Sequence, residues 1–563
     1  MNSRYSIKHV IIIVLFVVHL LPIWIFKFIP TQDGISHVYN AYVLKDYHKH
    51  ENYKLRKIFK LNLKPFPNWT SHALLMLLMY VVPPLVCEKI LLSLCIVLLP
   101  LSLFYFLDAV DKGKAIFGLL GFIYAYSFPL HMGFYNFVLS LSMYFFTLGY
   151  WWKHKDKMSL VNGVVLYMLL LGTYICHYMS YFLVVLSLSF FAFYSACFKV
   201  LGYQNEGRNS GAFNTLKVLI GKLRPLLLFL VLMLPAYLIM AAYYLNGIRA
   251  YKCSYANILD LLEYFFSMGS IVSFGSGQAL IARILIYFFI VVFLLALIRR
   301  IREACTFQGE AVSSDISRET KWEQICSIAM NGRWQFLLMA GILTALYFMA
   351  PRTIGPGGSG GNWINERIHI YIFLVLLPFI NVDFHRYIRR AMMGFIIVLT
   401  LWHLSSNAYA YYYLNKEMIE MTSSAGLMES HTTFTVYPNE TNAPSDYLGE
   451  LDYVGPFLHL PSYFCLNNGA VYLANYEALF NYFPINFKHE GYYLVKEADY
   501  VLVWHRGHDE IEEWKKILME LHKKGYVRLH SGKYNSLYRA RRMKPDEDLW
   551  HGKKMLRKKA DGA

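Results

Sequence analysis

Charged residues are scarce in this chain of 563 residues. Only 16% of the residues are charged, whereas 56% are hydrophobic, and the apolar residues gather in long runs. Soluble multidomain proteins do not have this composition. The sequence therefore predicts a polytopic membrane protein, and its many Tyr and Phe residues are typical of helix ends in the headgroup region.

Other common sequence signals are also missing. The eight cysteines have no metal-like spacing, and we find no internal repeat or heptad array. Cys253 and Cys465 fall in regions that we expect outside the membrane, where they could pair. The first apolar run, 8–28, lacks a small-residue cleavage site, so we expect a retained helix rather than a signal peptide. The sequence predicts no cofactor, but it leaves a loosely held divalent ion open.

The net charge of +17 could indicate a nucleic-acid partner. The basic residues, however, concentrate in short loops between apolar runs and in the last twenty residues. Membrane topology and anionic lipid account for such a distribution. We therefore expect membrane lipids as partners and no nucleic acid.

Eleven apolar segments have the length and hydropathy of spanning helices. They are 8–28, 89–107, 115–131, 135–152, 159–176, 178–198, 225–245, 278–298, 334–350, 367–382 and 391–410. Basic loops alternate as the positive-inside rule requires if the N-terminus is cytoplasmic. The alternation holds only if the run 71–84, which ends in two prolines, is a half-helix that does not cross.

The predicted fold is mainly α-helical, with two domains. Residues 1–410 form the transmembrane domain, and its first exterior loop is 30–88; residues 411–563 form a soluble α/β domain on the same side. In that domain we expect one helix, 509–524, and four strands, 433–437, 500–504, 526–530 and 536–539. In the first loop, the apolar spacing of 35–43 predicts a helix lying in the membrane interface, with nearby lysines facing lipid phosphates.

Asp33 is the leading candidate for catalysis. It follows the first apolar run directly, where a carboxylate beside the hydrocarbon and facing water could deprotonate a hydroxyl. An Asp followed by Gly34 and an amphipathic run is equally typical of a helix N-cap. His37 lies four residues on, where it could orient the carboxylate or face headgroups.

Further candidates lie at predicted exterior helix ends. The glycine-rich run 355–361 leads through Glu366 and Arg367 into the tenth helix. With Arg352 across the loop, this segment could bind phosphate or be a plain flexible connector. Asn136 and His177 could line the same cavity as Asp33. We therefore list His37, Asn136, His177, Arg352, Glu366 and Arg367 as candidate substrate-binding residues and assign no metal ligand.

Residues 8–410 resemble the GT-C superfamily of polytopic glycosyltransferases, which includes protein O-mannosyltransferases and aminoarabinose transferases. The features that carry the resemblance are Ile29-Pro30-Thr31-Gln32-Asp33, the entry Pro67-Asn68-Trp69, Pro83-Pro84, Glu88-Lys89 and the turn near Pro129. The resemblance implies an inverting transfer of a sugar from a polyprenyl-phosphate-type donor, with Asp33 as base. Cationic groups would stabilise the departing phosphate, and our candidates for them are Arg352 and Arg367.

The sequence also departs from this family. Many relatives carry a second acidic residue after the first, or in the turn before the fourth helix. Here Gly34 follows Asp33, and 131–136 contains no acid, so a metal-bridged carboxylate pair is not supported. The expectation is a bacterial inner-membrane enzyme acting on the periplasmic face on a glycan, lipid or protein acceptor. The alternatives are a transporter or lipid flippase and a non-catalytic assembly protein.

Overall fold

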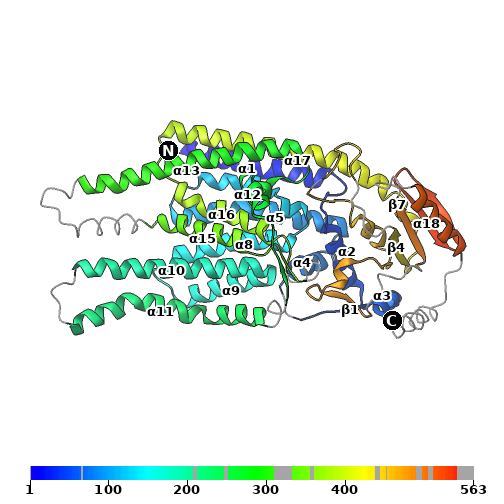
Figure 1. Ribbon diagram of the computed structural model, residues 1–563, viewed down its shortest axis with the longest axis horizontal. Coiled ribbons are helices and arrows are strands. Elements are labelled where there is room, and N and C mark those ends of the chain that lie inside the picture. The colour runs from blue at the N-terminus through cyan, green and yellow to red at the C-terminus, as the bar shows by residue number, and fades with distance from the viewer. Residues whose placement is uncertain are drawn as a thin grey trace.

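The computed structural model describes residues 2–64, 67–206, 212–245, 251–309, 332–355, 361–437, 444–451, 453–489, 498–504 and 511–541. Long helices lie side by side along the longest axis, and a region of strands and short helices covers one end of them (Figure 1). The long helices are α1 (Asn2–Ile25), α5 (Pro84–Val110), α8 (Tyr135–His154), α9 (Leu160–Cys176), α10 (Tyr178–Glu206), α11 (Ala212–Tyr243), α13 (Ser276–Gly309), α15 (Trp334–Met349), α16 (Ile364–Ile380) and α17 (Arg386–Met421).

Among the described residues, five helical stretches are long and apolar enough to cross a membrane. They are Pro84–Val110, Tyr178–Cys197, Leu223–Tyr243, Ser276–Glu303 and Arg386–Leu427. Shorter apolar helices accompany them, at His9–Ile25, Ile116–His131, Leu160–Cys176 and Trp334–Met349. Several helices of this length and composition indicate a multi-pass membrane protein.

Ten of the eleven segments predicted to span coincide with a single helix of the structure. The exception is 115–131, which is divided into η2 (Ile116–Leu119), α6 (Leu120–Ala125) and α7 (Phe128–His131). Pro129 lies in the first turn of α7, and the capping residue Ser127 is extended. Because proline has no N–H to donate, it suits the first turn of a helix, where that N–H would have no partner, and it begins a new helix here instead of continuing α6.

Helix ends that the charge pattern assigns to one side of the membrane lie in contact. Lys114 Nζ is 2.7 Å from Asp383 Oδ1, which joins the segments after α5 and α16. Arg333 donates to the carbonyl of Val110 at 2.9 Å. The opposite helix ends meet in the same way, since the amide of Asn68 donates to the carbonyl of Cys176 at 3.2 Å.

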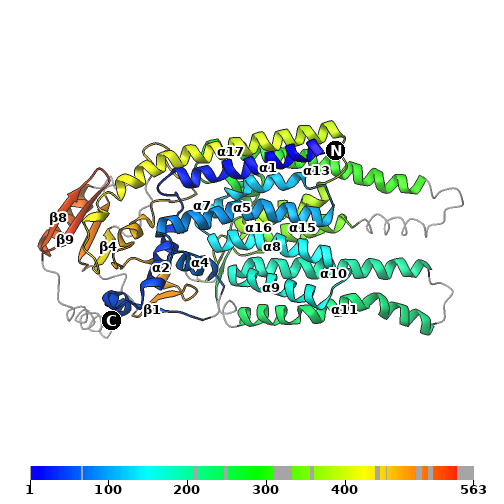
Figure 2. The same ribbon diagram turned by 180° about the vertical axis from the view of Figure 1, so that it is seen from behind.

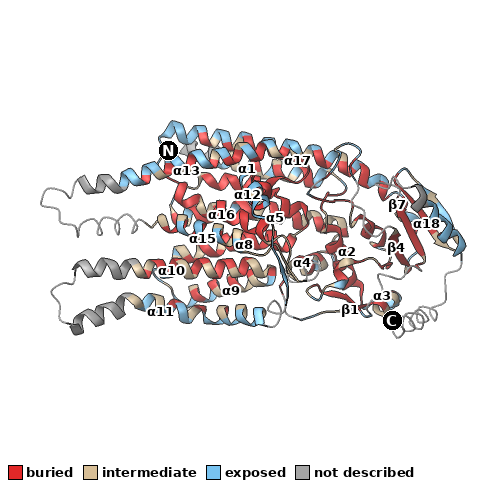
Figure 3. Cartoon of the chain, viewed as in Figure 1, coloured by how far each residue is buried: buried red, intermediate tan, exposed pale blue. Residues whose placement is uncertain are grey.

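The segment between α1 and α5 folds against these opposite ends. It contains α2 (Gly34–Asp46), η1 (His50–Asn52), α3 (Tyr53–Ile58), β1 (Phe59–Leu61) and α4 (Thr70–Leu78). The half-helix predicted at 71–84 is α4, whose nine residues extend only about 14 Å and are too short to cross. The prediction of an interfacial surface helix at 35–43 is wrong. Twelve of the 13 residues of α2 are buried, because α4, α5 and the C-terminal region pack around it (Figure 3).

The C-terminal region contains a mixed five-stranded sheet in the order β5-β4-β7-β9-β8. Its strands are β4 (Thr433–Tyr437), β5 (Val471–Tyr472), β7 (Tyr500–Trp504), β8 (Tyr526–Ser531) and β9 (Asn535–Ala540), and α18 (Ile511–Lys523) precedes β8. The four strands predicted from sequence are confirmed, and α18 matches the described part of the predicted helix.

The connections between β4 and β7 reach back to the helical bundle. They contain η7 (Leu460–Cys465), η8 (Tyr476–Leu479) and β6 (Ile485–Phe487). Strand β6 pairs with β1 in antiparallel register, so that Lys60 lies opposite Asn486. From behind, α17 runs beside α1 and continues into the C-terminal region (Figure 2). Cys253, in β2 (Cys253–Ser254), is exposed, Cys465 is buried, and both are free thiols.

Candidate functional site

Two backbone segments in close contact position Asp33. The amide of Gln32 donates to the carbonyl of His131 at 2.8 Å, and the amide of Asp33 donates to that of Met132 at 3.1 Å. Gly133 has a φ of +82°, and a Cβ at this position would lie 2.5 Å from the amide nitrogen of Gly34. Only glycine combines this φ with so close an approach of two backbones.

Gly34 has no room for a side chain. A Cβ there would overlap the hydroxyl groups of Tyr135 and Thr31. The Tyr135 hydroxyl donates to Glu88 Oε1 at 2.8 Å and lies 3.0 Å from Thr31 Oγ1. This buried hydrogen-bonded group fills the space after Asp33, which gives a physical reason why no second acid follows it.

Asp33 occupies the N-cap position of α2, but its side chain makes no capping hydrogen bond. Its backbone carbonyl instead accepts from the amides of Ser36 and His37, at 3.0 and 3.2 Å. Gln32 Nε2 donates to Asp33 Oδ1 at 3.3 Å, and His459 Nε2 lies 3.5 Å from the same oxygen. The carboxylate is therefore not occupied as a helix cap.

Burial is the main influence on the Asp33 carboxyl group, whose side chain is only 13% exposed. It raises the pKa of Asp33 to about 6, and Glu477 adds to this effect. His37 and hydrogen bonds from Gln32 and Tyr476 oppose it. A carboxylate with a pKa near 6 is ionised at neutral pH and is a stronger base than an exposed one, as proton abstraction requires.

The Asp33 carboxyl group lines a cavity of about 450 Å³ between the helix ends and the C-terminal region. Its walls combine a few polar groups with many aromatic side chains, a composition typical of small-molecule sites. Polar lining residues besides Asp33 include Gln32, His37, Asn68, Asn136, His177, Asn362, Arg367 and His459. Apolar and aromatic lining residues include Phe134, Phe137, Tyr178, Met179, Phe182, Tyr243, Trp363, Tyr476, Phe480, Tyr482 and Phe483.

Among the described residues that line the cavity, Arg367 is the one with a permanently charged cationic side chain. Its Nη1 donates to His177 Nε2 at 3.0 Å, and its guanidinium lies 4.1 Å from the centre of the Phe134 ring. Because a guanidinium only donates, His177 must accept and is neutral. Burial and the charge of Arg367 accordingly hold the pKa of His177 well below its usual range. Sequence analysis chose both residues, and the fold brings them together.

Three other candidates have different surroundings from those expected. Arg352 pairs with the buried Glu366, at 2.9 Å between Nε and Oε1, and neither residue is among the lining residues.

Asn136 does line the cavity, but its side-chain amide is hydrogen-bonded to the backbone of a neighbouring segment. Its oxygen accepts from the amide of Ser71 at 2.7 Å, and its nitrogen donates to the carbonyl of Asn68 at 2.9 Å. Asn136 thus holds the start of α4. Residues 356–360 of the glycine-rich run lie outside the described residues.

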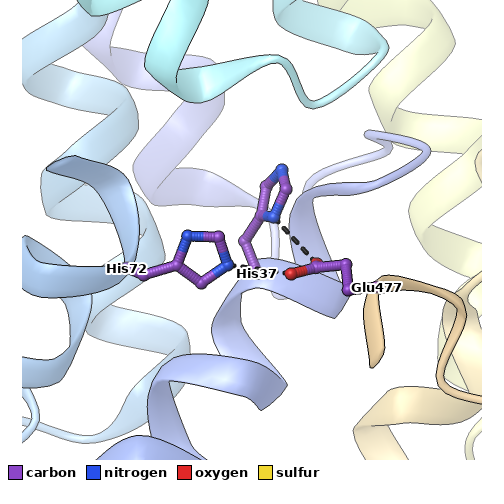
Figure 4. Close-up of side chains that lie close together, drawn as sticks. All are labelled: His37, His72 and Glu477. Carbon is purple, nitrogen blue, oxygen red and sulfur yellow. Dashed lines mark hydrogen bonds and ion pairs between the residues drawn. The ribbon is translucent and has the colours of Figure 1, made fainter. Parts of the chain in front are cut away.

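His37 does not orient Asp33. Its Nε2 lies 3.1 Å from the carbonyl of Gly133, and its Nδ1 lies 2.8 Å from Glu477 Oε1. His72 Nε2 lies 2.9 Å from the other oxygen of Glu477 (Figure 4). Burial alone would raise the pKa of Glu477, but the two imidazoles hold it well below its usual range.

Sequence reasoning missed four residues around Asp33: His72, His459, Tyr476 and Glu477. The ring of His459 stacks on that of Tyr476, with 4.2 Å between ring centres. The last three come from the C-terminal region, more than 400 residues from Asp33. The one local signal was an acid, Glu477, directly before the apolar residues 478–480, and this pattern says nothing about its partners.

Comparison of the chain with protein-family models and with curated proteins found no match.

Proposed function

We propose that this protein is a membrane glycosyltransferase that moves a sugar from a polyprenyl-phosphate-type donor to an acceptor hydroxyl, with Asp33 as the base. The observation that carries the proposal is the position of Asp33. Its carboxylate makes no capping bond, has a pKa raised to about 6 and opens into a cavity that also contains Arg367. A base and a cation on one aromatic-lined cavity are the groups that this transfer needs.

In this mechanism the acceptor hydroxyl attacks the anomeric carbon of the sugar, and the bond from that carbon to the phosphate oxygen breaks. Asp33 takes the hydroxyl proton, and the phosphate leaves on the lipid with the bonding electrons. Arg367 stabilises the negative charge that develops on that phosphate. Displacement by a single attack inverts the configuration of the sugar.

The lining residues suit both parts of a lipid-linked sugar. Aromatic side chains such as Trp363 and Tyr482 can pack on the apolar face of a sugar ring. Tyr178, Met179, Phe182 and Tyr243 come from α10 and α11, two of the helices with membrane-spanning stretches. They form an apolar wall against which the first isoprene units of the lipid would lie.

The charge pattern favours a periplasmic site in a bacterial inner membrane. If the positive-inside rule holds, the N-terminus and the contact between Lys114 and Asp383 are cytoplasmic. Eleven crossings then put Asp33 and the C-terminal region on the exterior side. The acceptor would be a glycan, lipid or protein of the cell envelope.

The decisive experiment compares envelope glycans by mass spectrometry in cells with the native chain, a deletion or the variant Asp33→Asn. Membrane levels of the two proteins are matched. We expect the deletion and Asp33→Asn to lose the same glycan, because asparagine keeps the shape of the side chain but cannot accept the proton. The missing sugar then identifies the product.

Asp260→Asn is the matched control, since Asp260 lies exposed in the first turn of α12 (Ile258–Phe266). It should leave the glycan unchanged. If Asp33→Asn cells keep the glycan that deletion removes, Asp33 is not the base. If deletion changes no glycan, the transferase proposal itself is wrong.

A further inference from the structure

Three buried side chains from distant segments converge beside the cavity. His37 comes from α2, His72 from α4 and Glu477 from η8, so that 440 residues separate the first from the last. One donor atom from each residue lies within 4.8 Å of the other two. Figure 4 shows both rings facing the carboxylate of Glu477. His37 also lines the cavity, whereas Glu477 and His72 lie behind it.

Two arrangements satisfy these groups: an ion pair between protonated His37 and Glu477, 2.8 Å apart, or a metal ion held between them. The contact of His37 Nε2 with the Gly133 carbonyl, at 3.1 Å, requires the hydrogen on Nε2. In the neutral ring Nδ1 is then a bare lone pair, 2.8 Å from Glu477 Oε1. Both atoms are shielded from solvent and neither makes a directed hydrogen bond. A proton between them would need a nearly straight N–H···O line, whereas a metal ion sits to one side of the N···O line.

The ligand types fit zinc. Two imidazole nitrogens and one carboxylate form a common protein set for Zn²⁺ and leave a fourth position open. Ligands on one tetrahedral zinc ion are about 3.4 Å apart. The two histidine contacts with Glu477, 2.8 and 2.9 Å, would open by about half an ångström, and the donor atoms that now lie up to 4.8 Å apart would close by about 1.4 Å. The Gly133 carbonyl already orients the His37 ring through its second nitrogen, as metal-bound histidines require.

We propose that His37 Nδ1, His72 Nε2 and the Glu477 carboxylate bind a zinc ion. The ion ties the C-terminal region to α2 and α4. It also fixes the cavity wall, because Tyr476 precedes Glu477 and stacks on His459, which faces Asp33. The site differs from the carboxylate pair that the sequence failed to support, since Glu477 is its one acid. It does not depend on the proposed transferase activity.

The test uses the full-length protein, purified in detergent, stripped with a chelator, reloaded with zinc sulfate and desalted. We expect about one zinc per chain by elemental mass spectrometry. X-ray absorption at the zinc edge should show two nitrogen ligands at about 2.0–2.1 Å. Chelation should lower the unfolding temperature, and zinc but not magnesium should restore it. No retained zinc, or zinc with sulfur ligands, overturns the proposal.

Variants then locate the ion. His72→Ala and the isosteric Glu477→Gln should each lose the bound zinc and the response of the unfolding temperature to chelator. His48→Ala, at an exposed histidine of the same segment, should keep both. Zinc that survives in Glu477→Gln and His72→Ala lies elsewhere and overturns the assignment. If a variant does not fold, the spectrum of the native chain still decides, since two histidines and one carboxylate are required.

Discussion

At the scale of single residues, the raised pKa of Asp33 links function to stability. Its value of about 6 lies above the ordinary 3.8 of an aspartate, so the folded state holds its proton more tightly than the unfolded state. Stability is then highest where the group is protonated and falls as the pH rises from about 4 to about 6. The raised pKa that suits the proposed base therefore lowers the stability of the fold at neutral pH.

We therefore expect Asp33→Asn to unfold at a higher temperature than the native protein at about pH 7.5. The two should coincide below about pH 3, where the native side chain is protonated in both states. The difference at neutral pH is up to about 3 kcal/mol, since one pKa unit corresponds to about 1.4 kcal/mol. Thermal unfolding in detergent at several pH values measures it. A native protein that is more stable than the variant at neutral pH would contradict the burial of Asp33.

Gly133 offers a second test at this scale. Gly133→Ala should move the segment around Asp33 and abolish activity, because the added Cβ meets the backbone of Gly34. Gly113→Ala is the control: its φ of +77° imposes the same backbone strain of about 1–2 kcal/mol, but nothing lies within 4 Å of the added carbon. Activity and unfolding temperature are measured for both. Equal losses in the two variants would mean that strain, and not crowding, matters.

At the scale of elements, the start of α16 separates two arginines that the sequence placed together. Arg367 faces the cavity and Arg352 pairs with Glu366. Arg367→Lys should lower transfer about tenfold or more, because lysine loses the planar set of donors. Arg352→Lys keeps the ion pair and should stay within about twofold of the native rate. Transfer from a radiolabelled lipid-linked sugar measures both rates. Equal losses in the two variants would mean that Arg352 also contacts the phosphate.

How far the sequence predicts this molecule also depends on the element. Long apolar runs predicted the helices because hydrocarbon demands about 20 apolar residues whatever the partners are. The spacing in α2 predicted one buried face, yet Asn40 and Asp46 on its other faces are buried as well. Polar faces can be buried when a distant segment supplies hydrogen bonds, here Asn475 for Asn40. Periodicity carries no information about such partners, which is also why Glu477 was missed.

At the scale of the whole molecule, the C-terminal region is part of the site. Strand β6 pairs with β1, and the amide of Gly455 donates to Gln32 Oε1 at 3.0 Å, directly beside Asp33. The division into a membrane domain and a separate exterior domain therefore describes the chain order better than the site. Local sequence singled out Asp33 and Arg367 as candidates, and both line one cavity, but their surroundings are made by contacts over hundreds of residues.

This arrangement predicts a crosslink. Lys60 and Asn486 lie directly opposite each other in an antiparallel pair, where Cα atoms are about 4.5–5.5 Å apart, within the range of a disulfide. The double variant Lys60→Cys and Asn486→Cys should form a disulfide under mild oxidation, seen by mass spectrometry of the digested protein. Lys60→Cys combined with Ser531→Cys, on β8, should form none. Failure of the first pair would contradict the docking of β6.

The contacts at the end of α17 have a consequence for the proposed reaction. Asn535 Nδ2 donates to the carbonyl of Met421 at 2.6 Å, so β9 is fastened to the end of that helix. The pairing of β1 with β6 fastens the region a second time. If the proposed transfer takes place, a C-terminal region attached at two places should not move away from the helices in each reaction cycle. The lipid phosphate released by the proposed transfer should then leave sideways into the bilayer past Tyr178 and Tyr243, whose rings are stacked with 3.9 Å between their centres.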